Sequence, residues 1–301
     1  LLPRSHTHLA LPPSPTLRSS DLAYLYYRTV TIDHTKVAGN LTDHPFVFAT
    51  TNNDLRTVGN GGHVTSIDGY DIVFSPNSDG SARYEHEIES YGAVTGKFVA
   101  HVKIPAISST VDPVFYLVYG DAGVITSQED IPGVWDANFS MVQHFHGSAW
   151  TNMRDSTSNN NDPTAEEGNP TYSQAGVVGK CVELDGNDAF RLANAASLSP
   201  EAGTMTLEVW FRTSTDPTPN YSYLWTDYNG TPRVAMTLNN DDYTRGYFRD
   251  GEGDESGAGA NNRNFDDDVW HYILFTRDGT TVDSYWEGAL LNDWQNIDPA
   301  L

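Results

Sequence analysis

The sequence predicts an all-β protein made of antiparallel sandwiches, and three observations lead to this fold class. Short runs alternate apolar and polar residues with a period of two, as in "YRTVTID" (27–33). Gly, Asn and Asp separate these runs at the intervals typical of antiparallel sandwiches. No stretch carries a persuasive amphipathic helical repeat. With 301 residues, the chain is long enough for two domains with ordinary cores.

The first domain is predicted to span residues 23–125. In its first strand, Arg28, Val30 and Ile32 lie on one side and the intervening residues on the other. Further strands are expected at "HPFVFAT", "YDIVFSP", "ARYEHEIES", "GKFVAHVKIP" and "PVFYLVYGD". Residues 1–22 show no periodicity, lack the apolar stretch of a signal peptide and resemble translated adapter DNA. They are expected to be a non-native or disordered segment outside the fold.

A connector is predicted at residues 126–138, where the Pro132-Gly133 pair interrupts regular structure. The second domain then spans residues 139–301. Its short β runs are separated by Asn, Gly and Asp turns: "FSMVQHFHG", "KCVELDG", "TMTLEVWFRT", "YSYLWTDYNG", "RVAMTLNND", "RGYFRDG", "WHYILFTRDG" and "TVDSYWEGALL".

Both halves resemble known families. The motifs "YRTVTIDHTKVAGNLTDHPFVF", "YEHEIESY" and "FVAHVKIPAISSTVDPVFYLVYGD" resemble an uncharacterised β-sandwich domain of prokaryotic surface proteins, over about residues 24–121. The motifs "GKCVELDGNDAFRL", "MTLEVWFRT" and "DDVWHYILFTRDGTTVDSYWEGALL" resemble the laminin-G-like jelly roll of the concanavalin A-like superfamily. The second resemblance implies two stacked antiparallel sheets and a binding role. Because that family normally continues beyond "YWEG", the jelly roll is expected to be incomplete at its C-terminal end.

The formal net charge of -23 argues against nucleic acid and anionic membranes as partners, and no apolar run is long enough to cross a bilayer. Divalent cations suit such a chain better. The loops "RDSTSNNND" and "LDGNDAF" supply candidate calcium ligands at Asp155, Asn159, Asp185, Asn187 and Asp188. Turn formation alone explains the same residues, so calcium stays a hypothesis.

A candidate sugar-binding set lies in "NYSYLWTDYNG". Tyr221, Tyr223 and Trp225 are expected on one strand face, with Tyr228 close by. Sugar rings stack on exposed aromatic rings, although a buried core face is the commoner arrangement for such residues. Trp210, Trp270 and Trp286 lie in strands matching the jelly roll and are expected in its core.

Two further groups could in principle carry chemistry. Glu85, Glu87 and Glu89 recur at every second position and are expected on an exposed strand face, with His86 and Ile88 pointing inward. Catalysis is not expected there.

His144 and His146 are expected to share a strand face as well. Zinc would need at least one more ligand, and the sequence positions none, so these histidines are expected to be structural.

These observations favour a non-catalytic extracellular or cell-surface binding module that recognises carbohydrate or a surface protein. Two alternatives stay open: an accessory region of a larger glycoside hydrolase or lyase, and a structural spacer or phage-tail-like component.

Overall fold

The fold is described by a computed structural model. It describes residues 16–17, 23–193, 196–198, 204–215, 217, 221–228, 232–239, 243–249, 255–260, 263–278, 281–291 and 294–296. Nearly all regular structure in these residues is antiparallel β, and the single α-helix is the four-residue α1 (Ile131–Val134). The predicted fold class is therefore confirmed. No described helix has the length and apolar character needed to cross a membrane.

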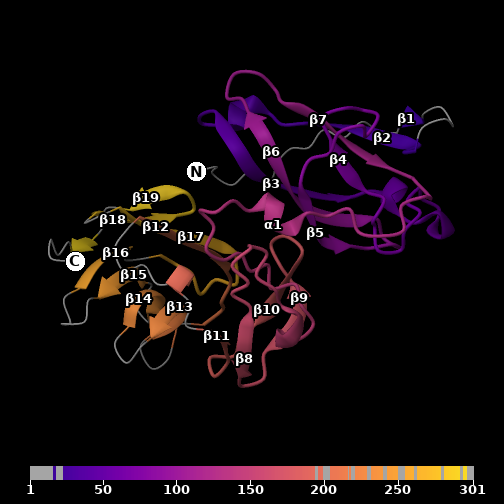
Figure 1. Cartoon of the computed structure of the whole chain (residues 1–301). Coiled ribbons are helices and arrows are strands. Elements are labelled where there is room, and N and C mark those ends of the chain that lie inside the picture. The colour runs from indigo at the N-terminus through magenta and orange to yellow at the C-terminus, as the bar shows by residue number, and fades with distance from the viewer. Residues whose placement is uncertain are drawn as a thin grey trace.

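The first domain is a sandwich of two sheets (Figure 1). One sheet has the order β1-β2-β7-β4: β1 (Thr16–Leu17), β2 (Tyr26–Thr31), β7 (Val114–Tyr119) and β4 (Val73–Ser75). The other has the order β3-β6-β5: β3 (Leu41–Thr51), β6 (Lys97–Ile107) and β5 (His86–Tyr91). Three 3-10 turns lie between strands: η1 (His34–Lys36), η2 (Asn53–Leu55) and η3 (Val58–Asn60). Strand β1 lies in the segment that was expected to stay outside the fold.

Apolar side chains from both sheets fill the first core. Phe48 of β3 packs edge-on against Phe74 of β4, with ring centroids 5.3 Å apart, and both rings are fully buried. Arg28, Val30 and Ile32 are all buried, which confirms that they share one side of the first strand and shows that this side faces inward. Burying these rings on alternate positions of facing strands is what holds two sheets together.

The predicted connector, residues 126–138, is not an isolated linker, because part of it lies along β5. Strand β5 is at the edge of its sheet, and unpaired backbone groups at an edge need partners. The backbone N–H of Ile88 donates to the Glu129 carboxylate (2.6 Å), and the N–H of Asp130 donates to the His86 carbonyl (3.1 Å). Helix α1 follows, buries Val134 and packs against β5 and β6 (Figure 1).

Two small two-stranded sheets come next. They pair β8 (Pro163–Glu167) with β11 (Ala189–Leu192) and β9 (Thr171–Ala175) with β10 (Lys180–Glu183); η4 (Trp150–Asn152) and η5 (Ala196–Leu198) are short turns. The strand predicted at "QHFHG" is wrong. Gln143 makes only an isolated bridge with Asp155, and Phe145 adopts a positive φ of 53°, which breaks the extended backbone.

The last part is a second two-sheet sandwich. One sheet has the order β12-β17-β18-β19: β12 (Met205–Phe211), β17 (His271–Asp278), β18 (Thr281–Trp286) and β19 (Ala289–Leu291). The other has the order β13-β14-β15-β16-β20: β13 (Tyr221–Tyr228), β14 (Pro232–Asn239), β15 (Tyr243–Arg249), β16 (Glu255–Ala260) and β20 (Trp294–Asn296). Phe211 and Phe275 of the first sheet pack with Val234 and Met236 of the second to form its core.

Candidate functional site

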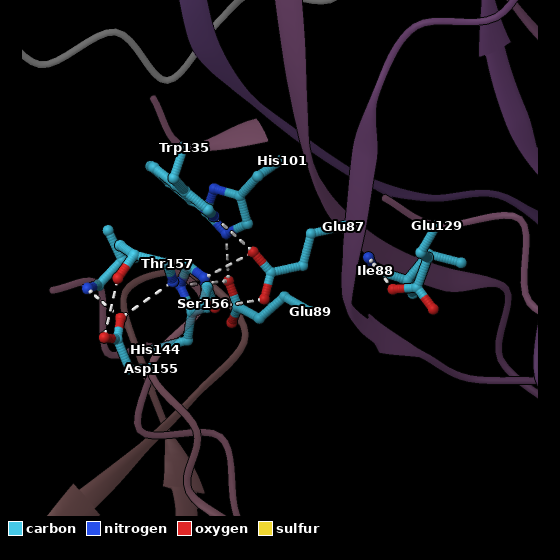
Figure 2. Close-up of polar contacts among 11 residues, drawn as sticks. Glu87, Ile88, Glu89, His101, Glu129, Trp135, His144, Asp155, Ser156 and Thr157 are labelled. Carbon is cyan, nitrogen blue, oxygen red and sulfur yellow. Dashed lines mark hydrogen bonds and ion pairs between the residues drawn. The ribbon is translucent and has the colours of Figure 1, made fainter. Parts of the chain in front are cut away.

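A group of buried polar side chains lies where the segment after α1 covers β5 and β6 (Figure 2). We call it the junction cluster and define it as Glu87 and Glu89 of β5, His101 of β6, and Trp135, His144 and Ser156. The last three come from residues 135–157, which we call the junction segment. It joins parts of the chain that are 48 to 69 residues apart in sequence.

Two residues of the cluster correct the sequence prediction. Glu87 and Glu89 do share a face of β5, as their spacing requires, but this face is covered rather than exposed: the two residues are only 4% and 7% exposed. The junction segment packs over them. His86, on the opposite side of the strand, is buried too, so β5 is enclosed on both faces. Periodicity predicts which residues share a face but not what covers that face.

Glu87 is the hub of the cluster. Its carboxylate accepts hydrogen bonds from Trp135 Nε1 (2.9 Å), His144 Nε2 (3.2 Å) and Ser156 Oγ (2.6 Å). Burial by itself raises the pKa of this carboxyl group. The hydrogen bond and charge of His144 and the hydrogen bonds from Ser156 and Trp135 outweigh burial and lower the pKa to about 2. Glu87 is therefore ionised at neutral pH and fastens the junction segment to the first sandwich.

Glu89 lies between two imidazole rings. Its Oε2 is 2.9 Å from His101 Nε2 and 3.9 Å from His144 Nδ1, and the two rings stack with centroids 4.2 Å apart. Burial lowers the pKa of His101, although Glu89 opposes this. The other ring nitrogen of His101, Nδ1, is buried without a hydrogen-bond partner among the described residues. One ligand atom from each of Glu89, His101 and His144 lies within 4.8 Å of the others.

His146, which was expected to pair with His144, stays outside this group. Its ring centroid is 6.2 Å from that of His144, and burial lowers its pKa. The sequence missed the contribution of β5 and β6 because their residues are more than 40 positions from His144. One sequence feature could have pointed to His101. It is a polar residue inside "GKFVAHVKIP", a run whose apolar residues are typical of a buried strand.

The predicted calcium ligands organise loops. Asp155 uses both oxygens within its own loop: Oδ1 accepts from the backbone N–H groups of Val142 and Thr157, and Oδ2 from the Thr157 hydroxyl and the Asn161 N–H. Asn159 donates its amide to the carbonyls of Phe139 and Ser140. This Asx-type turn holds Ser156 against the first sandwich.

Asp185, Asn187 and Asp188 form a separate turn. Asp188 accepts from the N–H groups of Asp185 (3.0 Å) and Asn169 (2.7 Å), and Asp185 accepts from that of Asn187 (3.0 Å). Among the described residues, no hydrogen bond or ion pair joins this turn to the Asp155 loop. Calcium binding by these five residues stays a prediction.

The prediction that the aromatic residues of β13 share one strand face is wrong for Tyr223 and Trp225, the two whose side chains the structure describes. Tyr223 is opposite Thr237 and Trp225 is opposite Met236, so β13 has one extra residue between them. This bulge turns Tyr223 outward, where it is 40% exposed, while Trp225 packs against the second core. The side chains of Tyr221 and Tyr228 lie outside the described residues.

A different aromatic pair is displayed on the other sheet. Trp210 was expected in the core, but the alternation of β12 places it outward with 36% exposure, on the same side as Glu208. It lies opposite Tyr272 of β17, with ring centroids 5.1 Å apart, and the Tyr272 hydroxyl donates to the Glu208 carboxylate. Burial raises the pKa of Tyr272, and Glu208 raises it further. We call Glu208, Trp210 and Tyr272 the aromatic platform.

The other two tryptophans differ from each other. Trp286 packs against the second core, as expected, whereas Trp270 is half-buried beneath the guanidinium group of Arg212, 5.5 Å from the ring centroid.

Comparison with known families gives an assignment for this part of the chain. Residues 184–296 match the family described as "Concanavalin A-like lectin/glucanases superfamily", a laminin-G-like group. This range includes both sheets of the second sandwich. Residues 184–296 form a laminin-G-like jelly roll.

The predicted resemblance is thus confirmed over residues 184–296, whose fold is of the lectin type, whereas the match does not reach residues 139–183 of the predicted second domain. The first half of the chain is a β-sandwich, as expected, but the match does not reach it, so its family membership stays a prediction. No curated protein and no solved structure matched the chain.

Proposed function

We propose that this chain is a non-catalytic, extracellular or cell-surface binding module and that its laminin-G-like domain recognises carbohydrate. The observation that carries the proposal is the match of residues 184–296 to a superfamily that includes lectins. The acidic composition, with a formal net charge of -23, also suits neutral or cationic ligands better than nucleic acid.

The aromatic platform supplies the chemistry that sugar recognition requires. An exposed indole such as that of Trp210 offers a flat apolar surface for the C–H face of a sugar ring. The Glu208 carboxylate and the Tyr272 hydroxyl lie beside it and can accept and donate hydrogen bonds with sugar hydroxyl groups. Apolar stacking combined with a few placed polar groups supports a binding role for this face.

The same contacts support a non-catalytic role. Glycoside hydrolysis uses a pair of carboxyl groups, one of which acts as an acid while the other is a base or a nucleophile. Of the three platform residues, only Glu208 carries a carboxyl group, so the platform does not supply that pair.

A glycan array with purified protein tests this proposal. We expect binding to a subset of glycans and a loss of at least tenfold in affinity for Trp210→Ala. Tyr223→Ala is the matched control, because Tyr223 is a similarly exposed aromatic residue on the opposite sheet. Unchanged binding in Trp210→Ala would remove the platform from the proposal, and no binding to any glycan would contradict carbohydrate recognition. Repeating the array with a chelator tests the calcium prediction.

A further inference from the structure

We propose that Glu89, His101 and His144 form a zinc site that fastens the junction segment to the first sandwich. Imidazole nitrogens and a carboxylate oxygen are ordinary zinc ligands, and three such donors from three separate elements converge here. The site does not depend on the carbohydrate proposal, since it lies in the first sandwich and the junction segment rather than in residues 184–296.

The distances between donors are close to those that zinc imposes. Bonds of about 2.0–2.1 Å in tetrahedral geometry separate neighbouring ligand atoms by about 3.4 Å. Glu89 Oε2 lies 2.9 Å from His101 Nε2 and 3.9 Å from His144 Nδ1, on either side of this value. The two rings are stacked with an interplanar angle of 24°, so they must rotate for their lone pairs to meet at one ion.

The position of His144 suits this role. When its Nε2 donates to Glu87, the neutral ring has its lone pair on Nδ1, which lies 3.9 Å from Glu89 Oε2. A carboxylate that accepts from the remote N–H of a metal-bound histidine is the usual outer partner in zinc sites, because it orients the ring and raises its basicity. Glu87 is in turn held by Trp135 and Ser156. It is a positioning residue for His144 and not a ligand.

The charge balance also favours a cation. Glu87 and Glu89 are buried side by side, and within the described residues the only ion pairs that reach them come from His101 and His144. Buried carboxylates need compensating charge, which a bound cation supplies. The buried Nδ1 of His101 has no hydrogen-bond partner among the described residues, so His101 lacks the outer partner that Glu87 gives His144. With three protein ligands, a fourth position is left for water.

Zinc titration of the full chain, stripped with a chelator, tests the proposal. We expect one equivalent of Zn²⁺ to bind with micromolar or tighter affinity and to raise the midpoint of thermal unfolding. Ca²⁺ should not compete with Zn²⁺ for this equivalent, because one carboxylate and two imidazoles suit zinc better than calcium. Co²⁺ should give the intense visible bands of a four-coordinate site. His144→Gln and Glu89→Gln should each abolish this equivalent, whereas Glu87→Gln should weaken affinity about 10- to 100-fold and keep the stoichiometry.

Two matched controls separate this site from others. His146→Gln alters a histidine of the same segment, and His34→Gln removes the imidazole of the exposed Asp33–His34–Asp112 group, whose ligand atoms also lie within 4.8 Å. Both variants should keep the zinc equivalent.

If a ligand variant fails to fold, X-ray absorption of the zinc-loaded wild-type chain decides. Two imidazoles around the ion support the proposal. No zinc binding, or a zinc equivalent that survives in folded His144→Gln, would overturn it.

Discussion

Replacing Glu87 by Gln is the sharpest probe of how the junction segment is held. The change keeps the size of the side chain but removes the negative charge that Trp135, His144 and Ser156 all face. The carboxyl pKa falls from 4.5 to about 2 on folding, and this difference corresponds to roughly 3 kcal/mol of stability at pH 7. Glu87→Gln should therefore lower the free energy of unfolding of the first sandwich by roughly 3 kcal/mol.

The effect should depend on pH with a definite sign. Because the folded pKa is the lower one, the contribution is complete above pH 4.5 and is lost as the pH falls from there towards about 2. At pH 3 the unfolded chain binds a proton at Glu87 while the folded chain mostly does not, which removes about 2 kcal/mol of the contribution. The gap between wild type and variant should narrow by that amount between pH 7 and pH 3.

Urea unfolding in a chelating buffer measures this gap without any contribution from a metal ion. Fluorotryptophan NMR follows Trp135 itself, whose Nε1 donates to Glu87. The matched control is Glu85→Gln. Glu85 lies just before β5 but its side chain is 46% exposed and paired with Lys103, so its loss should cost less than about 1 kcal/mol. An equal gap at both pH values, or a cost no larger than that of the control, would refute the hub role of Glu87.

Three further predictions concern folding. Burial lowers the pKa of His86, so the chain should lose stability as the pH falls below 6.5, and His86→Gln should lessen that loss in pH-dependent urea unfolding. Trp225→Ala should destabilise the jelly roll by about 3 kcal/mol, whereas Tyr223→Ala should cost less than about 1 kcal/mol in the same assay; equal costs would contradict the bulge in β13. Gly246→Ala should cost about 3 kcal/mol or more, because the added Cβ would lie 2.1 Å from the ring of Phe275, and an unchanged thermal midpoint would exclude this close contact.

Local sequence patterns were sufficient for the fold class and for most of the strands. Alternation with a period of two is a property of the extended backbone itself, so Arg28, Val30 and Ile32 could be assigned to one side of β2 in advance. The motif order of the second half likewise predicted a laminin-G-like jelly roll, and residues 184–296 match that superfamily.

Register was beyond the reach of alternation alone. An extra residue in β13 reverses the side on which every later residue of that strand lies, so the shared face predicted for Tyr223 and Trp225 was lost. Residues 221–228 contain no Gly or Pro, so the sequence gives no local signal from which this bulge could be predicted. A similar limit applies to Trp210, because alternation pairs it with Glu208 but does not say which face of the sheet meets the core.

The sequence by itself determined that Glu87 and Glu89 share a face and that His144 carries a potential ligand. Only the tertiary structure decided that this face is buried and that His101 and His144 meet Glu89 there. The physical reason is that periodicity is set by the backbone over a few residues, whereas burial is set by whichever distant segment packs on top. Here the junction segment lies about fifty residues after β5 in the sequence. It covers the face that carries Glu87 and Glu89, which alternation alone would leave exposed to solvent, and encloses their charges.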